Sequence, residues 1–289
     1  MVLENLISPK RAEKKPVNMF FIGFLYASVA MFLSLWIFRD QSSLVMVFLT
    51  VMAALPLVYD TIKYEEKKDL KKTKEYLLLK EHSKALSFFI FLFLGTVISF
   101  SLWYILLPET IIDSVFNTQI STIKNINSNV FGIDIVTSNY IAGSDLFSQI
   151  FTNNLKVLLF SIFFSFFFGA GALFILIWNA SVISTAIGNF FRVNISQYAD
   201  SLGFVKAAGY FHVFSFSLLR YFIHGIPEIL AYFVGGLAGG IISIAITKHD
   251  IGTKDFNKVL IDSIDLIIIA VALLFGAGLL EVYVTPLFF

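Results

Sequence analysis

The sequence contains no cysteine among its 289 residues. This absence excludes disulfide bonds, thiolate metal sites, cysteine nucleophiles and palmitoylation. Charged residues are scarce, at 14%, and 21 Lys and Arg nearly balance 20 Asp and Glu, so no basic excess is available to bind nucleic acid. By contrast, 57% of the residues are hydrophobic and 34 are Phe. Soluble globular domains do not have this composition, which indicates a protein whose partner is the lipid bilayer.

The signature motifs of soluble enzymes are absent as well. The sequence has no P-loop, no GxGxxG, no HExxH and no GxSxG. Its four histidines, His82, His212, His224 and His249, stand at no spacing that forms a nucleophile–base pair or a metal pair. We therefore expect no enzymatic activity, no catalytic residue, no metal site and no cofactor.

Long apolar runs divide the chain into predicted membrane spans. Each run is long enough for a helix rising about 1.5 Å per residue to cross a hydrocarbon core of about 30 Å, although the second is marginal. The seven predicted spans are Asn18–Phe38, Leu44–Tyr59, Ala85–Leu107, Leu155–Trp178, Phe204–Ile223, Pro227–Thr247 and Val259–Val284.

The fifth and sixth predicted spans require a break between them. A single helix from Phe204 to Thr247 would measure about 66 Å, which is twice the membrane thickness. The segment His224–Glu228 supplies the break in this prediction, because Pro227 removes a backbone donor and Gly225 relaxes the helix.

A further apolar stretch, Ala180–Phe191, is too short to cross a bilayer and predicts a re-entrant or interfacial helix. The predicted fold class is therefore an all-α polytopic membrane protein with about seven transmembrane helices plus one short re-entrant or interfacial helix.

Positive charges are unevenly distributed along the chain. Short loops rich in Lys and Arg mark the cytoplasmic side of a membrane protein. With the amino terminus inside, the cytoplasmic segments hold most of the 21 Lys and Arg residues, and they include Arg192 and Lys206. This pattern predicts a multi-pass protein of the cell membrane with a cytoplasmic amino terminus and an external carboxyl terminus.

Two loops are long enough to contact other proteins. The inner loop, residues 60–84, is rich in lysine, and its Thr61–Ser83 segment predicts an amphipathic helix that is either a solvated hairpin near anionic lipid or a docking site. The outer loop, residues 108–153, predicts a helix from Glu109 to about Ile126 and a small cap or contact surface. A protein partner would bind through one of these loops.

Ionisable groups inside membrane spans are costly, so each one is a candidate functional residue. We predict that Glu228 and Glu281 pair with a basic side chain near the outer face, while Asn154 caps a helix or bridges the group. Asn179 is a secondary candidate. The predicted polar cluster comprises Arg220, His224, Glu228, Glu281, Asn154, Lys156 and Asn179.

Three roles stay open for this polar cluster. A satisfied structural network is favoured, and proton or substrate coordination is the second reading, because broken helices at membrane depth commonly form transport sites. His224 and Glu228 are four residues apart, a spacing that also suits two ligands of one metal ion, but no third ligand is defined.

Small residues predict where helices pack closely. Gly235 and Gly239, and Gly236 and Gly240, form two overlapping small-xxx-small pairs just after Gly225 and Pro227. Packing within the chain is favoured for these glycines, and a homodimer is the alternative.

Three stretches resemble one known family of integral membrane proteins. They read NNLKVLLFSIFFSFFFGAGALFILIWNA from Asn153, HGIPEILAYFVGGLAGG from His224 and AVALLFGAGLLEVYVTP from Ala270. They are similar to the stage II sporulation protein M family, in the branch that extends into archaea. The resemblance spans about Ala85 to Pro286, so we divide the chain into an amino-terminal anchor and lysine-rich part, 1–84, and a family-like helical domain, 85–289.

The resemblance implies a helical membrane protein without chemistry of its own. In spore formers the family member works with a membrane-anchored pair of peptidoglycan hydrolases, as a scaffold or anchor. The family is also distantly similar to permease subunits of type-2 ABC exporters. The expected function is therefore a membrane scaffold or complex subunit, and the alternative is a permease-like transport subunit with a separate ATPase.

Overall fold

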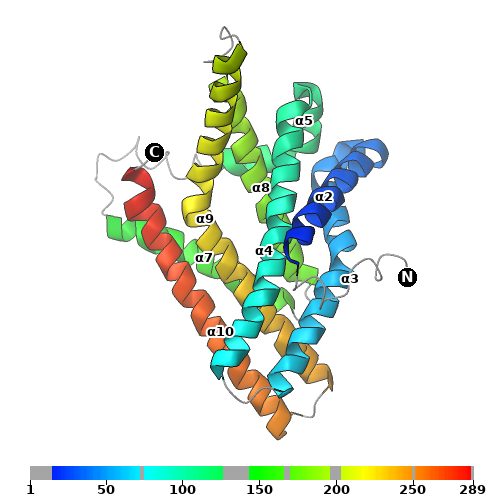
Figure 1. Ribbon diagram of the computed structural model, residues 1–289, viewed down its shortest axis with the longest axis vertical. Coiled ribbons are helices and arrows are strands. Elements are labelled where there is room, and N and C mark those ends of the chain that lie inside the picture. The colour runs from blue at the N-terminus through cyan, green and yellow to red at the C-terminus, as the bar shows by residue number, and fades with distance from the viewer. Residues whose placement is uncertain are drawn as a thin grey trace.

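A computed structural model describes residues 15–71, 75–125, 143–165, 170–195, 203–248 and 251–287, and in these ranges the chain is a bundle of helices without a strand (Figure 1). Helices dominate because a backbone in hydrocarbon must satisfy its own hydrogen bonds. The α-helices are α2 (Val17–Ile37), α3 (Ser42–Lys71), α4 (Glu75–Leu106), α5 (Glu109–Val115), α7 (Gly143–Ser165), α8 (Ala170–Ile195), α9 (Gly203–Lys248) and α10 (Lys254–Leu279).

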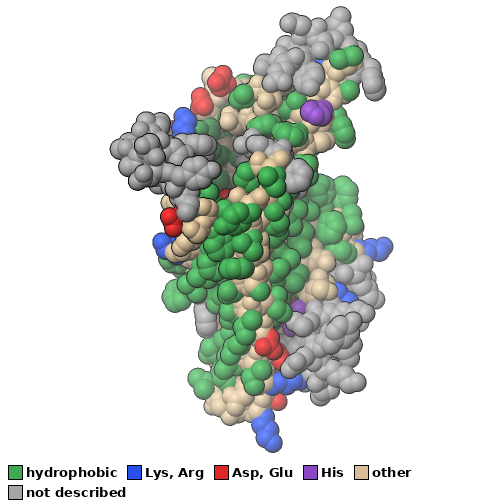
Figure 2. All heavy atoms as spheres, turned by 90° about the vertical axis from the view of Figure 1, so that its left-hand side faces the viewer, with side chains coloured by type: hydrophobic (Ala, Val, Ile, Leu, Met, Phe, Trp, Pro, Cys, Tyr) green, Lys and Arg blue, Asp and Glu red, His purple; other side chains and the backbone are tan. Residues whose placement is uncertain are grey.

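Within the described residues, seven helices are long and apolar enough to cross a membrane: α2, α3, α4, α7, α8, α9 and α10. The predicted fold class and the number of spans are therefore confirmed. Large apolar side chains are exposed on the outside of the bundle, for example Ile261, Ile264 and Ile268 on α10. Figure 2 shows such side chains covering the middle of one face, with charged groups gathered at its lower end.

The predicted break at His224–Glu228 is wrong, because α9 continues through it as one helix of 46 residues. At about 1.5 Å per residue this helix is about 69 Å long, so it extends well beyond a hydrocarbon core of about 30 Å. Pro227 lies inside the helix. It removes one backbone hydrogen bond, and packing of α9 against its neighbours outweighs that loss.

The predicted span Leu155–Trp178 is also wrong, because it joins parts of two helices. Helix α7 ends at Ser165 and α8 begins at Ala170, and the two helices pack against each other. The stretch Ala180–Phe191 lies inside α8, a helix of 26 residues that is long enough to span, so it is not a re-entrant helix. One error divides α9 into two spans and the other merges α7 and α8 into one span. The total of seven spans is therefore unchanged.

The first half of the bundle depends on a close crossing of α2 over α4. A Cβ atom on Gly23 would lie 2.2 Å from the carbonyl oxygen of Leu92, and one on Gly95 would lie 2.0 Å from that of Phe20. Only glycine permits two backbones to approach this closely. Ser28 Oγ and Ser99 Oγ then lie 2.8 Å apart and share a buried hydrogen bond between the helices.

The glycines of α9 form the corresponding seam in the second half. Gly235 and Gly239 face α7, where a Cβ on Gly239 would lie 2.6 Å from the carbonyl oxygen of Ile162. Gly236 faces Ala172 of α8, and Gly240 faces Ile62 of α3. The structure thus directs these four glycines to helices of the same chain.

The positions of the helix ends show on which side of the bundle Arg192 and Lys206 lie. Figure 1 shows the end of α3, the start of α4, the end of α9 and the start of α10 at one end of the bundle, and the end of α8 and the start of α9 at the other. Arg192 Nη2 donates a hydrogen bond of 3.1 Å to the Leu107 carbonyl, at the opposite end of α4 from its lysine-rich start. Placing Arg192 and Lys206 on the same side as the lysine-rich loop is therefore wrong, because α8 crosses the bundle.

The lysine-rich segment is not one amphipathic helix. Helix α3 runs on to Lys71 and α4 starts at Glu75, so Thr61–Ser83 forms the adjoining ends of two long helices. In the outer loop, α5 is followed by a second helical stretch at 117–125, close to the single helix predicted there.

We predict that Gly239→Ala destabilises the protein, because its Cβ would collide with the backbone of α7. Overpacking of this kind costs roughly 1 to 3 kcal/mol. The matched control is Gly276→Ala on α10, where a Cβ meets nothing within 4 Å. Thermal unfolding in detergent should show a lower melting temperature for Gly239→Ala alone, and equal melting temperatures would contradict the seam.

Candidate functional site

Two carboxyl groups meet between α7, α9 and the end of α10. Glu228 belongs to α9, about two turns before the glycine seam, and Glu281 lies in a π-helical turn, Leu280–Val284, that follows α10. Their side chains lie next to each other. Asn154 Nδ2 of α7 donates a further hydrogen bond to Glu228 Oε1. Three helices therefore contribute one group each to this cluster, which we call the carboxyl pair site.

Two carboxyl groups that lie side by side have a chemical requirement. Ionised carboxylates repel each other and only accept hydrogen bonds, so such a pair is satisfied when one group carries a proton and donates it to the other. The Asn154 amide occupies one acceptor position of Glu228 and leaves the other carboxyl oxygens to the pair. The π-helical turn at Glu281 is a rare local conformation that occurs often at functional sites. The arrangement can hold, release or exchange one proton.

Of the three predicted basic partners, the structure describes the side chain of Lys156 alone. The prediction paired the carboxylates with basic side chains, but in the described part of the chain Lys156 forms no ion pair with them and is exposed on the outer face of α7. The side chains of Arg220 and His224 lie outside the described residues. Asn179 does not join the site, because its amide donates a 2.8 Å hydrogen bond to the Ile175 carbonyl of its own helix.

A second buried polar group lies at the lysine-rich end of the bundle. Lys68 Nζ lies 2.5 Å from Glu65 Oε1, and His82 Nδ1 lies 2.7 Å from Glu65 Oε2. The side chain of Glu65 is fully buried, and His82 is only 1% exposed. This group joins the end of α3 to the start of α4 just where both helices leave the apolar region.

The neighbouring Glu66 connects α3 to α9 across a long stretch of sequence. Its Oε2 atom lies 2.5 Å from Lys248 Nζ, and its side chain is buried while that of Lys248 is partly exposed. Buried carboxylates of this kind are tolerated only when they are paired. We call the two groups together the brace: Glu65, Lys68 and His82, with Glu66 and Lys248.

Sequence reasoning missed the brace because the lysine-rich segment reads as solvated. A usable signal was present in the helical spacing. Ile62 packs into the core, and Glu65 and Glu66 follow it at three and four residues, on the same helical face. Extending the apolar face of the second span by one turn would have predicted both carboxylates to be buried.

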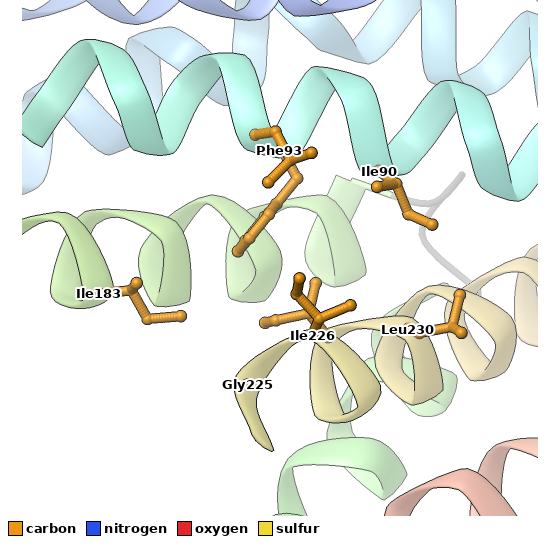
Figure 3. A pocket seen from close by; sticks show the side chains of 8 residues that line it. Ile90, Phe93, Ile183, Gly225, Ile226 and Leu230 are labelled. Carbon is orange, nitrogen blue, oxygen red and sulfur yellow. The ribbon is translucent and has the colours of Figure 1, made fainter. Parts of the chain in front are cut away.

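Gly225 contributes to an apolar recess and not to the carboxyl pair site. The recess lies between α4, α8 and α9. Figure 3 shows Ile90 and Phe93 of α4, Ile183 of α8 and Ile226 and Leu230 of α9 around it. No atom lies within 4 Å of the position that a Gly225 Cβ would take. Pro227, next along the helix, is half-buried.

These observations define a class of protein: a polytopic α-helical membrane protein with ionisable side chains inside its helical bundle. Residues 43–286 match the family model described as Stage II sporulation protein M. The match covers most of the 289 residues, so the chain belongs to this family, and the resemblance seen in the sequence is confirmed. No curated protein and no solved structure matches the chain.

The matched region begins earlier than the resemblance indicated. It starts at residue 43 rather than at Ala85, so α3 and the lysine-rich segment lie inside it. All five residues of the brace therefore fall within the matched part of the chain, as do the three residues of the carboxyl pair site.

We predict different effects for two substitutions at the carboxyl pair site. Glu228→Leu leaves Asn154 and Glu281 without their shared partner, which should cost roughly 1 to 3 kcal/mol. Glu228→Gln keeps an acceptor for Asn154 and adds a donor for Glu281, so it should retain most of the stability. Thermal unfolding in detergent checks this order, and equal losses for Gln and Leu would contradict the hydrogen bonds.

Proposed function

We propose that the protein is a non-enzymatic membrane scaffold or complex subunit that presents a rigid lysine-rich end to a protein partner. The observation that carries this proposal is the length of α3 and α4, which have 30 and 32 residues. At about 1.5 Å per residue they measure about 45 and 48 Å, so each exceeds a hydrocarbon core of about 30 Å by roughly 15 Å.

The brace supports a rigid extension instead of a flexible loop. Ion pairs from Glu65 and Glu66 hold the end of α3 against α4 and α9. Their neighbour Lys67 is exposed and Lys63, one turn earlier, is half-buried, so these two charges share one outer face. An ordered surface loses less conformational entropy when it binds a partner than a flexible loop does. This favours docking over the solvated reading of the segment.

Orientation follows from the same charges. We assign the lysine-rich end to the cytoplasmic side by the positive-inside rule, which places the amino terminus inside and the carboxyl terminus outside for seven spans. The chain lacks cysteine, so single cysteines report cleanly. Lys67→Cys should react with an impermeant maleimide only after the membrane is opened, and Glu109→Cys, exposed beside the far end of α4, should react in intact cells. Reaction of both from one side would contradict this topology.

Charge reversal on the outer face of α3 tests the scaffold role. The variant is Lys63→Glu with Lys67→Glu, and the matched control is Arg39→Glu with Lys124→Glu, which makes the same change in charge at exposed sites away from the lysine-rich end. Crosslinking in native membranes with quantitative mass spectrometry should recover a specific partner with the wild type and the control. We expect recovery to fall about fivefold or more for the α3 variant. Equal recovery at matched folded yield would overturn the proposal.

A permease-like transport subunit is the second candidate, and the carboxyl pair site favours it. Paired carboxyl groups in membrane spans commonly mark proton or substrate paths. Under this reading the partner is an ATPase, and Glu228→Gln gives a folded protein that no longer stimulates its ATP hydrolysis. Under the scaffold reading Glu228→Gln binds the same partner as the wild type and leaves its activity unchanged.

A further inference from the structure

One face of α7 exposes polar side chains along its first half. The exposed residues on this face are Asp145, Ser148, Gln149, Thr152, Asn153 and Lys156. The same face continues with apolar residues, because Leu159, Phe160 and Phe163 are each more than half exposed. Asn154 points the opposite way, into the carboxyl pair site. Helix α7 thus has an outer face that changes from polar to apolar at about Lys156, and we call its first half the polar strip.

Lipid is a poor cover for the polar strip. Helix α7 is the least apolar and the least buried of the seven candidate spans. Charges, amides and hydroxyls facing hydrocarbon are costly, whereas the same groups hold helices together when they face another helix. Within the described part of the chain, these side chains form no hydrogen bond or ion pair with the rest of the protein. The strip is therefore available to a second molecule.

The order of charges in the strip is self-complementary. Asp145 stands at one end and Lys156 at the other, three turns apart, with amides and hydroxyls between them. Two such strips in antiparallel register place each Asp145 beside Lys156 of the second copy. Gln149 and Ser148 then face Thr152 and Asn153. We propose that the polar strip binds the polar strip of a second copy of this chain, as an antiparallel pair around a two-fold axis.

The direction of α7 in the bundle fits this symmetry. In Figure 1, α7 lies across the long axis of the molecule, whereas α3, α4 and α8 run along it. Two copies inserted in one membrane in the same orientation are related by an axis along the membrane normal. Because α7 lies across such an axis more than along it, it meets its own copy in a near-antiparallel crossing and makes an isologous contact. The apolar half of the α7 face then stays in contact with lipid.

Disulfide crosslinking tests which residues of the two α7 helices face each other. The test holds whether the protein is a scaffold or a transport subunit. Differently tagged Asp145→Cys and Lys156→Cys chains are reconstituted together in phosphatidylcholine vesicles and oxidised. The two positions face each other in the antiparallel pair, so a mixed disulfide dimer should form. Two copies of residue 145 lie about 16 Å apart along the helices, so Asp145→Cys alone should not crosslink. Self-crosslinking of Asp145→Cys, or no mixed dimer, would overturn the register.

Charge exchange tests the self-complementarity without cysteine. Asp145→Lys and Lys156→Asp each place like charges together and should weaken dimerisation about tenfold, as measured by single-molecule photobleaching across a dilution series in vesicles. The double variant restores opposite charges and should dimerise within about threefold of the wild type. Asp255→Lys and Lys254→Asp, exposed at the α9–α10 end, are the matched controls and should leave the dimer unchanged.

The outcomes separate a second copy from other covers of the strip. Loss in the single variants with rescue in the double variant supports the antiparallel pair. A wild-type chain that stays monomeric across the dilution series overturns it and leaves α7 as an interfacial helix whose strip faces water. A dimer that is insensitive to both single exchanges also overturns it, because its interface then lies elsewhere. All substituted side chains are exposed, so unchanged thermal unfolding confirms that the variants are folded.

Discussion

Close backbone approach at α9 is the constraint on which the rest of the second half depends. This helix packs against α3, α4, α7, α8 and α10. Gly239 permits contact with the backbone of α7, and that contact places Asn154 beside Glu228. At the other end of α9, Lys248 reaches Glu66 of α3. Van der Waals packing is the main attraction between helices in lipid, so the distance that glycine permits decides which polar groups can meet.

Buried polar side chains form pairs at several of the contacts between helices. Ser28 and Ser99 pair where α2 crosses α4, and Glu65 pairs with Lys68 and His82 where α3 meets α4. Each of these groups would be costly in hydrocarbon without its partner. The scaffold and transport proposals rest on different parts of this pattern. The scaffold proposal rests on the brace, which joins the end of α3 to α4 and α9, and the transport proposal rests on the carboxyl pair site.

Predictions from the sequence succeeded where they depended on local apolar content and failed where they depended on turns. Seven spans follow from run length, but Pro227 and Gly225 suggested a break that α9 does not make. Sequence spacing also identified Glu228, Glu281 and Asn154 as costly polar residues, and the structure brings these three together. It also counted Lys156 among the partners of the carboxylates, whereas that side chain is exposed on α7, and it did not anticipate that the two carboxyl groups lie beside each other.

Composition and short motifs were enough to predict the membrane class, the number of spans and the family, because these depend on residue content and not on contacts between distant residues. The continuity of α9, the position of Ala180–Phe191 within α8 and the burial of Glu65 and Glu66 became known only from the folded chain. These features are set by contacts between residues far apart in the chain. The free energy of packing a helix among five neighbours outweighs the local cost of one proline. The sequence around the proline cannot reveal this packing energy, because it depends on residues of other helices.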